Sequence, residues 1–390
     1  MLSGVTTIEG GTVVKYTNGV QLKIQGTLNC LTMPDRPAIF TAKDDDTVGD
    51  PITGSTGNPG TNYYASTALF IDNNQSDLHN VRISYASQAL YYDYDTGYPH
   101  SLSHAQLVHC QQGIVPLNTT FWLRNVLMYD VKTNFYAASY YATGRVEHLT
   151  VDVADVMNGS TIISLYLTNS LLVGVTTLGP YTGVYTQTNS SGAGVFQTVG
   201  AGSHYLADNT YRNAGTTNIS YQLQAELRRL TTYPPLVLTN TVTVATTLSP
   251  QAQRDTDTPD LGYHYDTIDY AINTLTVTNT SLTLTNGVAL ATFGNNGIWL
   301  TDGSQLFSEG TPMNHNHFTS YFNVQEQSIN WSGSALDSTT INPYNYGVSP
   351  PNAQIRFTDF DGSSNCGNHI YSFSTNWVFT SLLLQVFCFS

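Results

Sequence analysis

Apolar and polar residues alternate over short stretches of this chain, and turn-forming residues separate those stretches. Residues 20–24 alternate between the two classes, residues 68–71 form a short apolar run, and residues 236–247 and 275–300 return to the same texture. A period of two is typical of strands, whereas helices repeat every 3.6 residues. We therefore predict an all-β fold.

A longer repeat is superimposed on this alternation. Five segments share the order apolar, any, Asn or His, small or apolar, any, apolar. They begin at residues 78, 102, 123, 146 and 167, so successive segments are 24, 21, 23 and 21 residues apart. A regular period of this length is typical of solenoids, in which each repeat forms one coil. The repeat predicts a parallel β-helix.

The third position of each repeat is expected at a bend between two strands. A short polar side chain tolerates left-handed backbone there and bonds to neighbouring backbone groups. Coils about 4.8 Å apart would stack these residues into a ladder: Asn80, His104, Asn125, His148 and Asn169. The same register places Arg124 beside Glu147.

We expect two segments, residues 1–270 and residues 271–390. The first carries a loop insert at about residues 44–62, which holds four Asp and four Gly, and a short helix over 221–230, where Leu223, Leu227 and Leu230 have helical spacing. The second ends in the apolar residues 377–389 with no polar cap behind them. That stretch is too short for a membrane span, so we expect a buried strand in a truncated solenoid, and a chain that is part of a longer protein.

The composition points outside the cell. Only 10% of the residues are charged, and the chain has four Lys and a formal net charge of -14. A surface that is polar without being ionic favours an extracellular or cell-surface location, and the negative charge excludes nucleic acid as a partner. Residues 1–5 have neither the basic nor the apolar region of a signal peptide. The four Cys are far apart and form no zinc motif, so we expect free thiols.

The coil length, the Asn-bearing bends and the lack of long helices resemble the pectin-lyase-like right-handed parallel β-helix superfamily over about residues 5 to 270. Residues 6–16 and 255–266 look like segments of large bacterial surface proteins. The resemblance implies a right-handed solenoid. It leaves function open, because the superfamily includes lyases, hydrolases, tailspikes and adhesins.

Catalytic motifs of that superfamily are not matched. Arg36-Pro37 lacks the second Arg of a pectate-lyase motif, and Asp44-Asp45-Asp46 lacks the other three motifs of a polygalacturonase. The Asp run reads as a solvated loop or a calcium site. His315 and His317 have a spacing that suits a metal, but their context favours a loop. The leading hypothesis is therefore noncatalytic, and a polysaccharide lyase or glycoside hydrolase is the alternative.

Acidic residues near position 260 resemble a calcium loop in their spacing. Asp255, Asp257 and Asp266 would occupy positions 1, 3 and 12 of such a loop, and Asp260 lies between them. Position 5 is Pro259 and position 6 is not Gly, which argues against an EF-hand. We keep another kind of calcium site over these four Asp residues as a hypothesis, beside a hydrogen-bonded cap.

Tyrosine is the remaining indication of a binding face. Tyr91, Tyr92 and Tyr94 follow one coil, and Tyr136 and Tyr140 follow another. Exposed rings on a β-face can stack on sugars, although packing between coils explains them equally well. We predict a rigid face for adhesion or polysaccharide binding.

Overall fold

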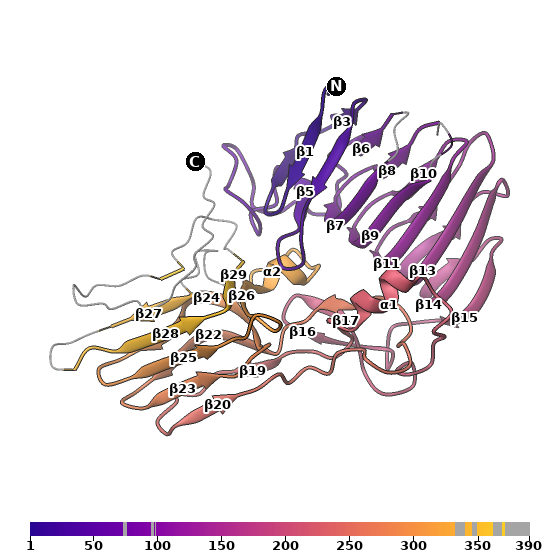
Figure 1. Ribbon diagram of the computed structural model, residues 1–390. Helices are drawn as coiled ribbons and strands as arrows, with labels where there is room; N and C mark the ends of the chain where they lie inside the picture. Colours follow the sequence, from indigo (N-terminus) through magenta and orange to yellow (C-terminus); the bar gives the residue numbers. More distant parts are fainter. Residues whose placement is uncertain are drawn as a thin grey trace. The chain divides into compact units, whose positions relative to one another are not determined.

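The computed structural model describes residues 1–72, 76–94, 97, 99–331, 340–344, 349–361 and 369–370. Over these residues the chain is all-β with parallel sheets (Figure 1). It divides into two compact units. The first comprises Met1–Gln197, Ser203–Thr232 and Arg254–Tyr265, and the second comprises Thr198–Gly202, Tyr233–Gln253 and Asp266–Ser390. The two units thus alternate along the chain between residues 198 and 266.

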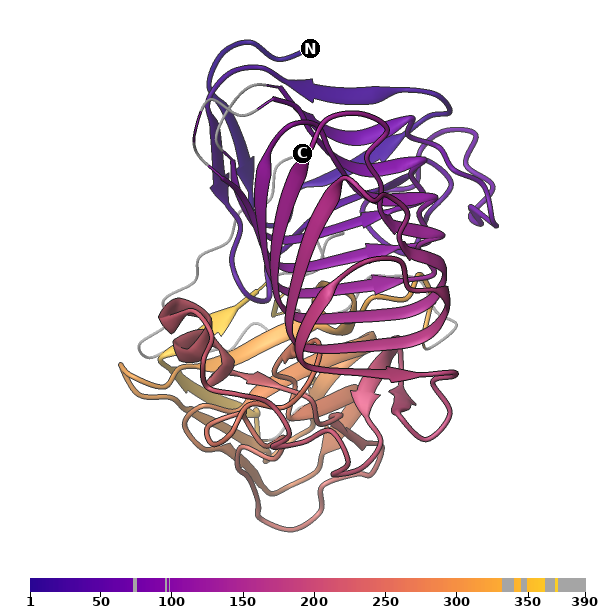
Figure 2. The ribbon, with the colours of Figure 1, turned by 90° about the vertical axis from the view of Figure 1, so that its right-hand side faces the viewer.

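The first unit contains a sheet of 13 strands within the described residues, all of them paired in parallel. Its order runs up one arm to β13 and returns along a second arm, so the sheet curls back on itself (Figure 2). This arrangement is compatible with a parallel β-helix. The first arm is β2 (Val13–Tyr16), β5 (Ala38–Ala42), β7 (Asp77–Ser84), β9 (His100–Val108), β11 (Thr120–Tyr129) and β13 (Ala142–Asn158); the second is β12 (Thr133–Phe135), β10 (Gln112–Pro116), β8 (Gln88–Tyr92), β6 (Thr67–Ile71) and β3 (Gln21–Ile24).

Further elements complete this part of the chain. β14 (Ile163–Thr177) continues the sheet from β13, and β15 (Thr182–Asn189) pairs with β14. β1 (Thr6–Glu9) pairs with β4 (Leu28–Leu31). Up to residue 266, and apart from two strands of the second unit, the chain also forms β16 (Phe196–Val199), β17 (Gly202–Leu206), α1 (Tyr221–Leu227), β18 (Leu230–Thr231) and β21 (Tyr265–Asp266).

The register confirms the repeat seen in the sequence. The first residues of the five segments are successive Cα partners across β7, β9, β11, β13 and β14: Leu78, Leu102, Leu123, Val146 and Leu167. All five are buried. Arg124 is the Cα partner of Glu147, as predicted. Because each repeat has nearly the same length, like positions lie above one another.

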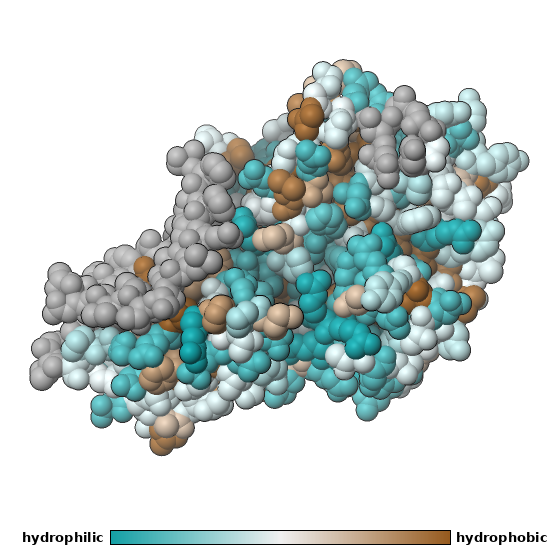
Figure 3. Space-filling view, in the orientation of Figure 1, coloured by the Kyte–Doolittle hydropathy of each residue, from teal (hydrophilic) through white to brown (hydrophobic). Residues whose placement is uncertain are grey.

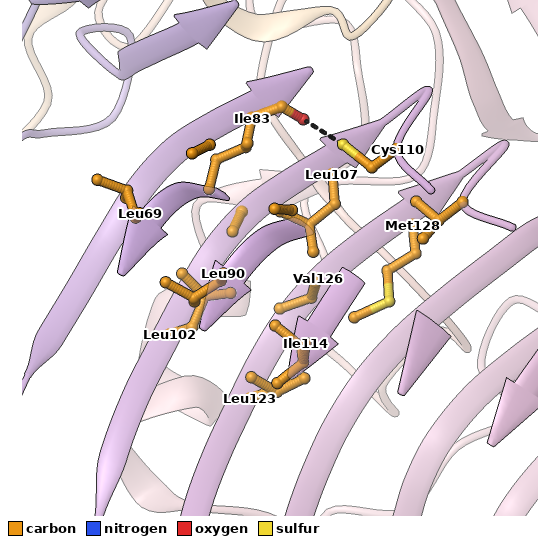
Figure 4. Packing of buried hydrophobic residues seen from close by; sticks show 14 of the residues in the cluster. Leu69, Ile83, Leu90, Leu102, Leu107, Cys110, Ile114, Leu123, Val126 and Met128 are labelled. Carbon is orange, nitrogen blue, oxygen red and sulfur yellow. Dashed lines mark hydrogen bonds between the residues drawn. The ribbon is translucent and has the colours of Figure 1, made fainter. Parts of the chain in front are cut away.

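Apolar side chains from both arms fill the space inside the curled sheet. Leu90 and Ile114 of the second arm pack near Leu102 and Leu123 of the first (Figure 4). Cys110 is also buried there, and its thiol donates to the carbonyl of Ile83 at 3.7 Å. Burial raises the pKa of the Cys110 thiol to about 12. Cys110 and the partly buried Cys30 are free thiols, as predicted; Cys366 and Cys388 lie outside the described residues.

The predicted ladder occupies left-handed backbone. Its five residues have φ between 47° and 56°. A second row of left-handed residues follows five positions after each of them, and sequence analysis did not identify it: Tyr85, His109, Asp130, Val153 and Gly174, with φ between 49° and 59°. Each strand repeat is therefore bounded by two such bends.

A later part of the chain covers the ladder. We call residues 211–232 and 254–265, which include the predicted helix α1, the strap. Asn169 bonds to both backbone groups of Thr216, accepting from its N–H at 2.8 Å and donating to its carbonyl at 2.9 Å. His148 Nδ1 lies 3.2 Å from the carbonyl of Gly262, and His104 Nε2 lies 2.9 Å from Glu226 Oε2. The ladder side chains thus hold the strap.

Ladder residues also bond to one another in pairs. Asn125 donates to His104 Nδ1 at 3.1 Å, and Asn169 donates to His148 Nε2 at 2.9 Å. The predicted bonding between coils is therefore present. The bonding to the strap was not predicted.

The second unit is built from two parallel sheets over its described residues, with Leu275, Leu290 and Leu306 in its core. One sheet contains β19 (Leu236–Leu238), β22 (Tyr270–Val277), β24 (Ala289–Leu300), β26 (Asn316–Ser320), β29 (Thr358–Phe360) and β27 (Ile341–Pro343). The other contains β20 (Thr246–Leu248), β23 (Ser281–Leu284), β25 (Gln305–Glu309) and β28 (Asn352–Arg356), and α2 (Tyr321–Val324) follows β26. The apolar residues 377–389 lie outside the described residues. Within the described part, no helix is long and apolar enough to cross a membrane.

Candidate functional site

Two carboxyl groups meet where β6 and β8 end. Phe70 pairs with Tyr91 and Ile71 with Tyr92, so Asp72 and Asp93 follow in register. The ladder of backbone hydrogen bonds continues to Asp93, whose N–H donates to the carbonyl of Ile71 at 2.9 Å. Neighbouring positions on parallel strands lie about 4.8 Å apart, so the two side chains are brought together.

The two carboxyl groups are hydrogen-bonded to each other. Burial and the neighbouring Asp72 raise the pKa of Asp93. Burial also acts to raise the pKa of Asp72, but hydrogen bonds from Lys23 and Gln25 outweigh it and lower that pKa. Lys23 Nζ lies 2.8 Å from Asp72 Oδ2. Two ionised carboxylates this close repel each other. As the pH falls, Asp93 therefore takes up a proton before Asp72.

Aromatic rings flank this pair. Phe70 and Tyr91 stack with ring centroids 4.4 Å apart, and the Lys23 ammonium lies 4.3 Å from the centroid of Phe70. Burial, and then the charges of Asp93 and Asp72, raise the pKa of Tyr91. Tyr94 is 56% exposed, and its backbone N–H donates to Asp93 Oδ1 at 2.8 Å. We call Lys23, Gln25, Phe70, Asp72, Tyr91, Asp93 and Tyr94 the Asp72–Asp93 cluster.

The other predicted tyrosines are placed differently. Tyr92 is fully buried and stacks on His100 at 4.4 Å, so its ring belongs to the core. Tyr136 is partly buried just after β12, with its N–H donating to the carbonyl of Ile114. Tyr140 is 64% exposed on left-handed backbone with φ of 68°. Of the five, Tyr91 and Tyr94 are brought together with the carboxyl pair.

Asp72 and Asp93 were missed from the sequence, although an indication was present. Leu69-Phe70-Ile71-Asp72 and Leu90-Tyr91-Tyr92-Asp93 share the order Leu, aromatic, apolar or aromatic, Asp. They are 21 residues apart, which is the length of one repeat. A repeat search that also compared the polar residue after each strand would have found the pair.

The acidic residues near position 260 are only partly brought together. Asp255 and Asp260 group with His264, and one possible ligand atom from each lies within 4.8 Å of the others. His264 Nε2 lies 2.7 Å from Asp255 Oδ2, and Asp260 Oδ1 accepts from the N–H of Asn213 at 2.7 Å.

Asp257 and Asp266 are not members of this group. The side-chain amide of Asn213 donates to Asp257 Oδ1 at 2.8 Å, and Asp266 belongs to the second unit. The calcium hypothesis stays a prediction. An imidazole in the group changes the donor set, because calcium takes oxygen ligands and imidazole nitrogen suits metals such as zinc.

The run Asp44-Asp45-Asp46 holds its own loop together between β5 and β6. Tyr64 donates to Asp44 Oδ2 at 2.6 Å, Thr41 to Asp45 Oδ2 at 2.7 Å and Ser55 to Asp46 Oδ1 at 2.9 Å. Hydrogen bonds from Tyr64 and Lys43 lower the pKa of Asp44 to about 2. The three carboxylates therefore serve the loop.

His315 and His317 lie in the second unit. His315 Nδ1 lies 2.9 Å from Asp359 Oδ2, and His317 Nδ1 lies 3.3 Å from Asp361 Oδ2. His317 is in β26, so the expectation of a loop is wrong there. Each imidazole already has a carboxylate partner in this arrangement.

No protein-family model, curated protein or solved structure matches this chain.

Proposed function

We propose that the first unit is a right-handed parallel β-helix and that the protein is a noncatalytic extracellular or cell-surface scaffold that binds polysaccharide at the Asp72–Asp93 cluster. The curled parallel sheet and the 21-residue to 24-residue register support the solenoid. Polar side chains cover most of the coloured surface in Figure 3, with apolar ones in small separate areas. The face shown therefore fits a protein that functions in water, with no large apolar patch among its coloured residues.

The observation that carries the proposal is the partly exposed ring of Tyr91 and the exposed ring of Tyr94 beside a carboxyl pair. A sugar ring has an apolar face that packs on aromatic rings and a rim of hydroxyls that needs hydrogen-bond partners. Asp72 and Asp93 offer carboxyl oxygens to the sugar hydroxyls, and Tyr94 adds an exposed ring. The cluster holds these groups on strand ends, where the backbone is fixed by the sheet.

A polysaccharide lyase or glycoside hydrolase remains the second candidate, favoured by the presence of two carboxyl groups with opposite pKa shifts. Hydrolases place a sugar between carboxyl groups that are about 5 to 10 Å apart. A direct hydrogen bond between Asp72 and Asp93 leaves no such room. Binding is therefore the better supported activity.

The test is retention of the full chain on a glycan array and on insoluble polysaccharides, with product release measured on every polymer that binds. We expect retention of the parent and about fivefold to tenfold weaker binding by Tyr91→Ala, which removes one stacking ring. Tyr185→Ala removes a ring that is 52% exposed on β15, and serves as the matched control. Lack of retention on every polymer would remove the proposal, and release of oligosaccharides would favour the enzyme.

A further inference from the structure

A row of outward side chains crosses β11, β13 and β14, away from the Asp72–Asp93 cluster on β6 and β8. Trp122 is the Cα partner of Arg145, and Arg145 is the Cα partner of Tyr166. The three strands are neighbours in the sheet and lie side by side (Figure 1). Trp122 is 43% exposed and Tyr166 is 44% exposed. Sequence analysis did not select these residues, although their separations of 23 and 21 positions match the repeat.

The structure explains why these large side chains face outward. Their neighbours along each strand, Phe121, Gly144 and Leu165, point inward and are buried. A Cβ on Gly144 would lie 2.4 Å from the ring of Phe121 and 2.9 Å from Leu165, so only glycine fits between them. Since alternate residues of a strand point to opposite faces, the inward packing fixes Trp122, Arg145 and Tyr166 on the outer face.

Arg145 is exposed and has no carboxylate partner among the described residues. Its guanidinium lies 5.6 Å from the ring centroid of Tyr166. The nearest acidic position in the row beside it is Glu147, whose two carboxylate oxygens accept from the N–H and the hydroxyl of Ser220 at 2.9 and 2.7 Å. Arg124, in turn, donates to Gln222 at 2.9 Å. The strap thus hydrogen-bonds to the charged side chains beside Arg145. The guanidinium N–H groups of Arg145 remain available to a ligand.

A row of hydroxyl groups runs along the other side. Thr120, Thr143 and Ser164 are successive Cα partners, two positions before Trp122, Arg145 and Tyr166. Because the spacing is two residues, both rows point to the same face of the sheet. The face therefore offers rings, one free cation and hydroxyls in parallel lines.

We infer that this row binds an extended acidic polysaccharide in which a charged sugar alternates with a neutral one. Trp122 and Tyr166 are separated by one intervening strand, so they lie about 9 to 10 Å apart across the sheet. That separation is comparable to two sugar units of an extended chain, so alternate units stack on the two rings. The unit between them presents its carboxylate to Arg145, whose guanidinium binds carboxylates in bidentate fashion. The hydroxyl row pairs with the sugar hydroxyls.

This inference rests on the proposed sugar binding and names the ligand class for a second face. Arg145 is one cation on a protein whose net charge is -14, and this net charge repels polyanions at long range. The row therefore suits a polysaccharide with widely spaced charges better than a densely charged one. Nucleic acid, with one phosphate per nucleotide, is disfavoured for the same reason.

The experiment compares three probes on the full chain by titration calorimetry: a polymer that alternates glucuronate with N-acetylglucosamine, a homopolymer of uronate, and neutral cello-oligosaccharides. We expect the alternating polymer to bind best. Arg145→Gln should weaken that binding about tenfold, the loss of one charged hydrogen-bonded contact. Trp122→Ala should weaken it about as much.

Arg228→Gln removes the same charge from an exposed position at the end of α1 and should leave binding unchanged. Equal affinity for the neutral and alternating polymers, or unchanged binding by Arg145→Gln, would overturn the inference. Binding that is lost in Tyr91→Ala but not in Trp122→Ala would overturn only this inference and would still support the proposed function. The reverse pattern would support this row and count against the Asp72–Asp93 cluster.

Discussion

The side chain of Asn125 binds the backbone of His264 as a neighbouring strand would. Asn125 Oδ1 accepts from the His264 N–H at 2.7 Å, and Asn125 Nδ2 donates to the His264 carbonyl at 2.9 Å. The two residues are 139 positions apart in the sequence. One left-handed ladder residue thus fastens the strap to the curled sheet.

Replacement of Asn125 tests that role. Asn125→Leu should remove both bonds, strand buried polar groups of the strap and strain the backbone at φ of 54°. We expect a loss of about 1 to 3 kcal/mol in the free energy of unfolding. Hydrogen exchange should show it first in residues 102–151 and in the strap, because each repeat contacts only its neighbours.

The matched control for this prediction is Asn118→Leu. Asn118 has φ of 48° but no side-chain bond to the strap, so the variant carries the strain without the lost contacts. If both variants have the same melting temperature and the same hydrogen-exchange protection in the strap, the ladder does not hold the strap.

The buried ladder residue His148 predicts a pH dependence of stability. Its Nδ1 faces the carbonyl of Gly262 and its Nε2 accepts from Asn169, so the ring is neutral. Burial, and then the nearby His264, lower the pKa of His148 from 6.5 to about 3. In this window the unfolded chain binds a proton that the folded chain does not, so stability falls as the pH drops from about 6.5 to about 3, by up to about 1.4 kcal/mol per pH unit.

His148→Asn should flatten this part of the pH profile, because Asn suits left-handed backbone and does not titrate. Urea unfolding at several pH values measures the slope. His315→Asn, at a partly exposed His of the second unit, is the control. An unchanged slope in His148→Asn would show that other groups set the acid sensitivity.

Sequence reasoning reached the first ladder but not the second. Asn80, Asn125 and Asn169 mark left-handed bends because Asn adopts them readily. The second row contains Tyr85, Asp130 and even Val153, which share no property, so only the three-dimensional register shows that they are equivalent. Their conformation is imposed by the stacked strands rather than by their own preferences.

The strap shows a second limit. Leu223 and Leu227 predict the helix α1 from local spacing, and the structure confirms it. The ladder contacts that dock this region join residues 47 to 139 positions apart, such as His104 and Glu226. No local pattern encodes which polar groups will meet over that distance.

The tyrosines show what alternation alone could have decided. Tyr91 and Tyr92 are adjacent in one strand, so their rings must point to opposite faces. Tyr92 is accordingly buried while Tyr91 is partly exposed. Asp72 and Asp93 required the register between β6 and β8, which the repeat length of 21 residues contains but composition does not.

The carboxyl pair predicts opposite effects for two similar substitutions. Asp93→Asn places an amide donor beside Asp72 and removes the like charge that an ionised Asp93 would carry, so stability at neutral pH should be unchanged or up to about 1 kcal/mol higher. Asp72→Asn loses the ion pair with Lys23 at 2.8 Å, and should be about 0.5 to 1 kcal/mol less stable.

The pH dependence of stability distinguishes the two carboxyl groups. Because the folded pKa of Asp93 is raised, its contribution to stability is present at low pH and is lost as the pH rises through that pKa. Asp93→Asn should lack this loss in unfolding curves measured from about pH 4 to about pH 7. Two variants that are destabilised equally would mean that the two carboxyl groups do not share a proton.

The strap also allows a direct test of calcium. His264 Nδ1 lies 3.1 Å from the carbonyl of Gly262, an acceptor only, and Nε2 lies 2.7 Å from Asp255 Oδ2. The Asp255 carboxylate is therefore already engaged by His264 in a buried hydrogen bond. Burial acts to raise the pKa of Asp255, but the hydrogen bond and charge of His264 outweigh it and lower that pKa. A calcium ion at this site would have to displace His264 from the carboxylate.

We therefore expect that neither calcium nor a chelator shifts the melting temperature, whereas Asp255→Asn lowers stability by about 1 to 3 kcal/mol, since it disrupts the buried hydrogen bond to His264. Asp257→Asn should have a small effect, because Asp257 meets only the amide of Asn213 and neighbouring groups, and it serves as the control. Thermal unfolding of the three proteins with and without calcium measures both effects. A calcium-dependent rise in the melting temperature that Asp255→Asn abolishes would establish the calcium site instead, because it would require His264 to give up the carboxylate to the ion.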